Sequence, residues 1–81
     1  MENITKSAVQ YFKKNDVNNL DEMDVFFFLT DLKEKEMINW DIVIKEGFYS
    51  IFSGGIIIKV ETLPTSLIGL ITFIENMNKK L

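Results

Sequence analysis

The feature that most constrains this chain is a glycine pair between two alternating apolar segments. Residues 48–52 and 56–61 are rich in aromatic and β-branched residues, and they flank Ser53-Gly54-Gly55. Glycine supplies the positive φ angles that a tight hairpin turn needs. A further alternating segment, residues 39–45, precedes the hairpin and carries Trp40, Ile42 and Ile44 on one side. Together these segments predict a small antiparallel sheet.

The alternation in the hairpin also predicts two unlike sheet faces. We expect the more apolar face to pack on helices, and it consists of Tyr49, Ile51, Ile56, Ile58 and Val60. We expect the other face to be mixed and partly hydrated, and it consists of Phe48, Ser50, Phe52, Ile57, Lys59 and Glu61.

Helical periodicity marks the segments on either side of the sheet. In residues 3–14, Asn3 can cap a helix whose apolar stripe contains Ile4, Ala8, Tyr11 and Phe12. In residues 65–80, Pro64 marks the entry and Thr65 or Ser66 can cap. The apolar face of this last helix consists of Leu67, Leu70, Ile71, Ile74, Met77 and Leu81.

Residues 20–36 are the least obvious helix, because the run 25–29 alone favours a strand. Asn19 as N-cap with Glu22 three residues later has the spacing of a capping box, so we expect a helix. One apolar stripe consists of Val25, Phe28, Leu29 and Leu32, and an opposite one consists of Leu20, Met23, Phe26 and Phe27. Such a helix is either sandwiched within the fold or contacts a partner.

The predicted fold class is therefore α+β, in the order α-α-β-β-β-α, with a single-layer antiparallel sheet packed against three helices. The chain has 81 residues, which suits a single compact domain spanning residues 1–81. Hydrophobic residues make up 47%, and a chain this short buries only about 60% of its unfolded surface. Some apolar side chains are thus expected at the surface, either as ordinary surface or as an interface.

The composition restricts the available chemistry. The chain contains no Cys, His or Arg, so thiolate and imidazole catalysis, and metal sites built on these groups, are unavailable. We expect no catalytic residues, no cofactor and no metal, and hence no enzyme. The formal net charge of −3 argues against nucleic-acid binding, which normally needs a basic surface.

The sequence predicts no membrane partner and a cytoplasmic location. The start of the chain lacks the basic and apolar regions of a signal peptide. The longest apolar region, residues 56–74, is interrupted by Lys59, Glu61 and Pro64, so it does not read as a membrane span. The absence of Cys agrees with a reducing compartment.

The candidate partner-binding residues fall into three groups. The acidic group consists of Asp16, Asp21, Glu22 and Asp24; the apolar group on helix 20–36 consists of Met23, Phe26 and Phe27; the third group consists of Trp40 and Tyr49. Each group also has a structural interpretation: helix capping and solubility for the acids, and core packing for the rings.

The leading functional hypothesis is a small protein-binding protein, most concretely an inhibitor or immunity-type protein that blocks a basic partner such as a nuclease toxin. The alternative is a self-associating structural or regulatory module, a homodimer built on helix 20–36 or helix 65–80. The element order also resembles that of winged-helix domains, but acidic residues outnumber lysines on helix 20–36, so nucleic-acid binding is the third hypothesis.

Overall fold

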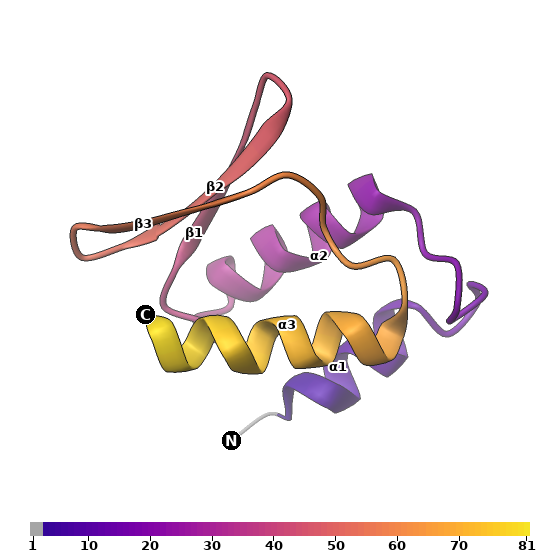
Figure 1. Ribbon diagram of the computed structural model, residues 1–81. Coiled ribbons are helices and arrows are strands. Elements are labelled where there is room, and N and C mark those ends of the chain that lie inside the picture. The colour runs from indigo at the N-terminus through magenta and orange to yellow at the C-terminus, as the bar shows by residue number, and fades with distance from the viewer. Residues whose placement is uncertain (1–2) are drawn as a thin grey trace.

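The computed structural model describes residues 3–81 and confirms the predicted α+β fold (Figure 1). The elements follow in the order α1 (Ile4–Tyr11), α2 (Glu22–Glu34), β1 (Asp41–Lys45), β2 (Phe48–Ser53), β3 (Ile56–Val60) and α3 (Leu67–Lys80). Each predicted helix and strand is present, although most are shorter than their sequence patterns.

The sheet has the order β1-β2-β3, and both strand pairs are antiparallel. Ile51 on β2 lies opposite Ile42 on β1 and Ile58 on β3, so these side chains share one face. The hairpin turn between β2 and β3 has positive φ angles of 53° at Gly54 and 92° at Gly55, which are those of a type I′ turn. The predicted glycine hairpin is thus confirmed.

The helices pack against the face that contains Ile51. The ring of Phe26 on α2 lies 6.0 Å from that of Tyr49, and the ring of Phe73 on α3 lies 6.4 Å from that of Trp40. Helix α1 closes the other side of α2, where the rings of Phe12 and Phe28 are 5.5 Å apart. The core residues are Ala8, Phe12, Leu20, Val25, Phe28, Leu29, Leu32, Ile38, Trp40, Ile42, Tyr49, Ile51, Leu63, Leu70, Ile74 and Met77.

One residue of the predicted core-facing set departs from expectation. Ile56 is 50% exposed, because it directly follows the hairpin turn, at the end of β3 farthest from Val60. Its neighbours on the same face, Ile58 and Val60, are half-buried against the core as predicted. The helices therefore leave the tip of the hairpin uncovered.

The caps of the helices correct one prediction. Asn3 caps α1, since its Oδ1 accepts from the backbone N–H of Thr5 at 2.8 Å, and Ser66 caps α3. For α2 the predicted cap, Asn19, was wrong. Asp21 is the N-cap, and its Oδ1 accepts from the N–H of Met23 at 2.8 Å. Asn19 instead closes a turn, because its backbone N–H donates to the carbonyl of Asp16.

Two connections far apart in the sequence are hydrogen-bonded to each other. The backbone N–H of Leu20 donates to the carbonyl of Thr65 at 2.7 Å, and that of Leu67 donates to the carbonyl of Val17 at 2.8 Å. This loop pairing joins the α1–α2 connection to the β3–α3 connection. It holds Leu20 in place just before Asp21, the residue whose carboxylate caps α2.

Candidate functional site

The second apolar stripe predicted on helix 20–36 lies partly at the surface. Phe27 is 52% exposed and Met23 is 39% exposed, whereas Phe26 is half-buried between Phe27 and Tyr49. Leu20, the remaining member, is buried because the chain is not helical there. Large apolar side chains on a solvent-facing helix are typical of interfaces.

Two carboxylates flank the exposed Phe27 ring. Asp24 precedes Phe27 by three residues and Asp31 follows it by four, so all three project from neighbouring positions on α2. Asp31 pairs with Lys35 at 3.0 Å, while Asp24 forms no ion pair within residues 3–81. We call Met23, Phe26 and Phe27 with Asp24 and Asp31 the α2 surface.

Tyr11 on α1 extends this surface towards the neighbouring helix. Burial raises the pKa of its hydroxyl above the ordinary value of 10.0, and the negative charges of Asp24 and Asp31 raise it further. The Tyr11 ring packs on α2 through Phe28, with the two ring centroids 5.0 Å apart. Tyr11 remains 45% exposed, so an aromatic ring lies beside the acidic edge of the α2 surface.

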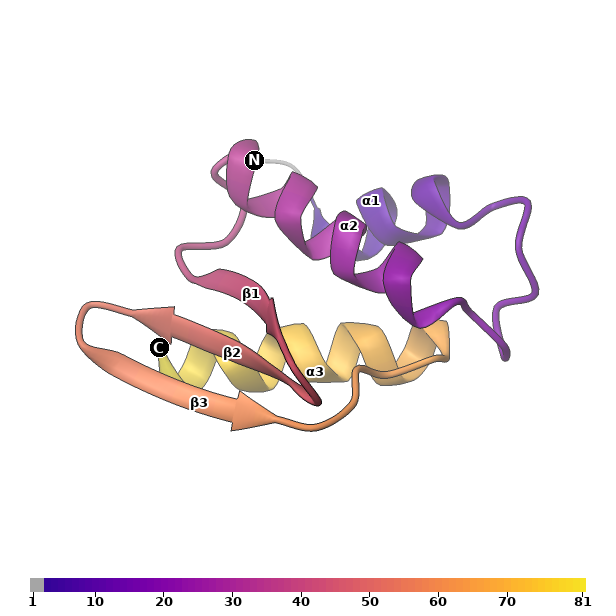
Figure 2. The same cartoon turned by 90° about the horizontal axis from the view of Figure 1, so that it is seen from above.

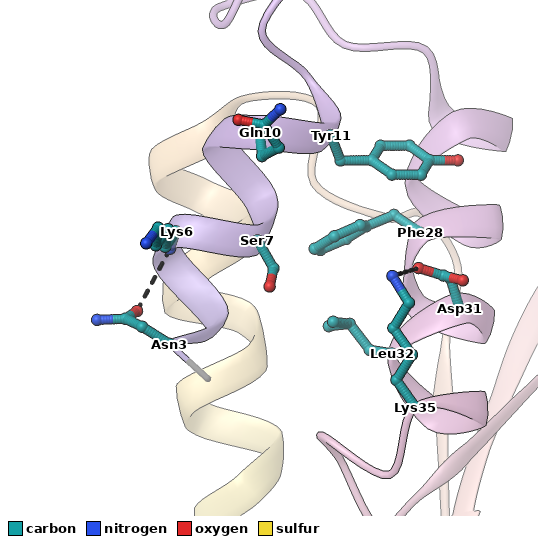
Figure 3. Close-up of a pocket in the computed structure, with 9 residues that line it drawn as sticks. All are labelled: Asn3, Lys6, Ser7, Gln10, Tyr11, Phe28, Asp31, Leu32 and Lys35. Atoms are coloured by element: carbon teal, nitrogen blue, oxygen red, sulfur yellow. Dashed lines mark hydrogen bonds and ion pairs between the residues drawn. The ribbon is translucent and has the colours of Figure 1, made fainter. Parts of the chain in front are cut away.

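A groove of about 560 Å³ lies between α1 and α2, next to Tyr11 (Figure 3). Phe28 and Leu32, both buried, form its apolar floor, and the Tyr11 and Phe28 rings are 5.0 Å apart. The rim is polar, with Lys6, Ser7 and Gln10 on α1, Asp31 on α2, and the cap residues Asn3 of α1 and Lys35 of α2. Asp31 therefore belongs both to the groove and to the α2 surface.

Three of the acidic candidates have structural contacts. Asp16 accepts from the backbone N–H of Asn18 at 3.0 Å, and Asp21 caps α2. Glu22 does not form the predicted capping box. Its Oε2 accepts from the backbone N–H of Leu63 at 2.7 Å, which fixes the connection after β3. Among residues 3–81, the carboxylate of Asp24 is the one in the acidic group that accepts no such backbone hydrogen bond.

The structure places Trp40 and Tyr49 in the core rather than on a surface. Trp40 is fully buried, and its Nε1 donates to Oδ1 of Asn78 at 2.8 Å. Tyr49 is 6% exposed and packs against Phe26. Their burial agrees with a role in core packing, and neither ring is exposed enough to contact a partner.

Sequence reasoning missed Asp31 and Tyr11 as members of the site. The spacing of Asp24, Phe27 and Asp31 along one helix was visible in the sequence and could have identified Asp31. The position of Tyr11 depends on how α1 packs on α2, so no local pattern could have identified it.

Among residues 3–81, no group of three or more His, Cys, Asp or Glu is arranged to hold a metal ion. No helix in the same range is long and apolar enough to cross a membrane. No protein-family model, curated protein or solved structure matches the chain.

Proposed function

We propose that this chain is a protein-binding protein that docks a basic partner on the α2 surface. The observation that carries the proposal is Phe27, which is 52% exposed between the carboxylates of Asp24 and Asp31. A lysine or arginine side chain fits such a surface, because its apolar stem packs on the ring while its cation meets a carboxylate.

The two kinds of contact have different effects. An exposed ion pair contributes only about 0.2–1 kcal/mol, so Asp24 and Asp31 act chiefly on the rate and selectivity of association. Apolar and aromatic anchors contribute most of the affinity in typical interfaces. In this proposal Met23, Phe27 and Tyr11 are the anchors, and the carboxylates select a basic partner.

The concrete form of the proposal is an inhibitor or immunity-type protein for a basic enzyme such as a nuclease toxin. A nuclease cleft is lined with cations that bind phosphate, and an acidic protein surface seated there excludes the nucleic acid. Inhibition of this kind needs no catalytic group on the inhibitor, which agrees with a chain that lacks Cys and His.

The test is a titration of the purified protein against a panel of basic nucleases, with acidic proteins of similar size as negative controls. Binding is followed by calorimetry and inhibition by residual nuclease activity, both at low and at high salt. We expect inhibition of a basic nuclease that weakens as salt increases. Absence of binding across the whole panel at low salt would contradict the inhibitor form.

Paired variants locate the binding surface. Asp24→Lys and Glu75→Lys change the net charge equally, but Glu75 lies on α3, away from the α2 surface. Phe27→Ser and Ile68→Ser each remove an exposed apolar side chain, and Ile68 lies on α3. We expect at least tenfold weaker binding for the α2 variants and less than twofold change for the α3 variants. Equal effects within each pair would contradict binding at the α2 surface.

A further inference from the structure

The outer edge of β3 is an unpaired sheet edge. Helix α2 packs beside β1, and Figure 2 shows β3 on the far side of the sheet from α2. Because Gly54-Gly55 is a two-residue turn, Ser53 and Ile56 form a hydrogen-bonded pair. Pairs alternate along the ladder, so the backbone N–H and C=O groups of Ile57 and Lys59 point to the free edge. Within residues 3–81 no other segment hydrogen-bonds to these groups.

This edge lacks the usual protection against pairing. Natural sheets protect edges with charged side chains, prolines or bulges. The register of β2 and β3 is continuous, residues 56–60 contain no proline, and Ile57 is 73% exposed. The one charge on the strand belongs to Lys59, whose Nζ lies 4.5 Å from the ring centroid of Phe48 on β2. That contact holds the cation over the sheet and away from the edge.

We propose that β3 pairs antiparallel with β3 of a second copy of this chain, about a two-fold axis at Ile58. In this register Ile57 of each copy forms a hydrogen-bonded pair with Lys59 of the other. On the helix-covered face, Ile58 of one copy lies opposite Ile58 of the other, and Ile56 of each copy lies opposite Val60 of the other. The pairing joins the two sheets and covers Ile56 and Ile57, the exposed apolar residues of β3.

The charge of the sheet edge and the residue pattern of β3 favour a second copy of the chain as the partner of this edge. The chain carries a net charge of −3, but residues 47–60 contain no acidic residue and only one lysine. Two copies that meet along this segment therefore bring none of its carboxylates together, because it has none. The antiparallel register places Lys59 opposite Ile57 rather than opposite the other Lys59, and it matches apolar residues with apolar residues on the helix-covered face. This inference is independent of the proposed function, since the α2 surface lies beside the opposite edge.

Sedimentation equilibrium over a concentration series tests the association. We expect a reversible dimer at high micromolar concentration. Ile57→Lys should raise the dissociation constant at least tenfold, whereas the matched control Ile68→Lys, at a position 79% exposed on α3, should change it less than twofold. Both positions are exposed, so circular dichroism should show the wild-type fold for both variants. A wild-type protein that stays monomeric throughout the series overturns the proposal.

Cysteine cross-linking tests the register, because the natural chain has no Cys. In the proposed pairing the Cβ atoms of two copies of residue 58 lie about 4.5–5.5 Å apart, and those of residue 57 or 59 lie diagonally at about 7–8 Å. We expect Ile58→Cys to form the disulfide dimer fastest. Equal rates for Ile57→Cys, Ile58→Cys and Lys59→Cys, or the fastest rate for Phe27→Cys on α2, overturn the β3 pairing. Ile57→Lys should still bind a basic partner, which separates this test from that of the proposed function.

Discussion

The indole N–H of Trp40 donates a 2.8 Å hydrogen bond to Oδ1 of Asn78, so a fully buried ring just before β1 is tied to the last turns of α3. The Phe73 ring meets the indole edge-on from the same helix. A buried N–H without a partner is costly, so this bond allows tryptophan to fill the centre of the core.

Asn78→Ala should lower the free energy of unfolding by about 1–3 kcal/mol, because it leaves the indole N–H of Trp40 unsatisfied. Asn76→Ala is the matched control, since Asn76 is exposed on the same helix and its side chain forms no hydrogen bond within residues 3–81. Urea denaturation followed by tryptophan fluorescence measures both variants. Equal losses would show that helix α3, and not the indole bond, is responsible.

Asp21→Ala should destabilise the protein by about 1 kcal/mol, the typical cost of removing an N-cap side chain. Asn19→Ala should cost less than about 0.5 kcal/mol, because Asn19 contributes only its backbone to the turn before α2. The same denaturation experiment compares the two. A larger loss of stability for Asn19→Ala than for Asp21→Ala would show that Asn19 is the N-cap.

Alkaline pH should reduce the contribution of Tyr49 to stability. Burial raises the pKa of the Tyr49 hydroxyl above its ordinary value of 10.0, and the hydrogen bond to Glu22 and the charges of Glu22 and Asp21 raise it further. Between the unfolded and the folded pKa, the unfolded state binds fewer protons, so the free energy of unfolding falls as pH rises. The contribution is complete below pH 10.0 and is lost as pH rises through the folded pKa.

Urea unfolding of the wild type and of Tyr49→Phe over a series of alkaline pH values isolates this effect. The stability difference between them should shrink as pH rises above 10.0. Tyrosinate absorbance of the folded proteins provides the direct titration. If the Tyr49 hydroxyl titrates at its ordinary value in the folded state, the expected pH dependence is refuted.

Substitutions at the two glycines of the hairpin turn should have different effects on stability. Gly55→Ala places a side chain at φ 92°, and the cost should be about 1–3 kcal/mol. An added Cβ meets no atom of residues 3–81 within 4 Å there, so the loss of stability comes from the backbone conformation. Gly54→Asn creates Asn-Gly, the preferred type I′ sequence, and should keep or slightly raise the stability. Thermal unfolding measures both, and a harmful Gly54→Asn would argue against the type I′ turn.

The order of elements could be predicted because each element carries a strong local pattern. The glycine pair predicted the hairpin turn, and the two apolar stripes predicted a helix over residues 20–36, of which the stripe of Val25, Phe28, Leu29 and Leu32 is the buried one. These patterns depend on residues close in sequence, so a single sequence is sufficient to recognise them.

The features that the sequence did not reveal depend on contacts between distant segments. The segment before α2 is held by the N–H of Leu20, which donates to the carbonyl of Thr65, and the carboxylate of Glu22 is held by the N–H of Leu63. Likewise, the unequal exposure of Phe26 and Phe27 follows from the position of Tyr49 next to Phe26. The sequence therefore suggested Met23, Phe26, Phe27 and Asp24 as candidate residues of the α2 surface. It did not suggest Asp31 or Tyr11.

The loop pairing has a consequence for exchange with deuterated solvent. Amide protons in connections usually exchange early, because local opening frees them. Those of Leu20 and Leu67 bond across the pairing, to Thr65 and Val17. They become free only when the segment before α2 separates from the segment before α3. Exchange at these two amides should therefore be as slow as in the core, and it reports when the α1–α2 connection separates from the β3–α3 connection.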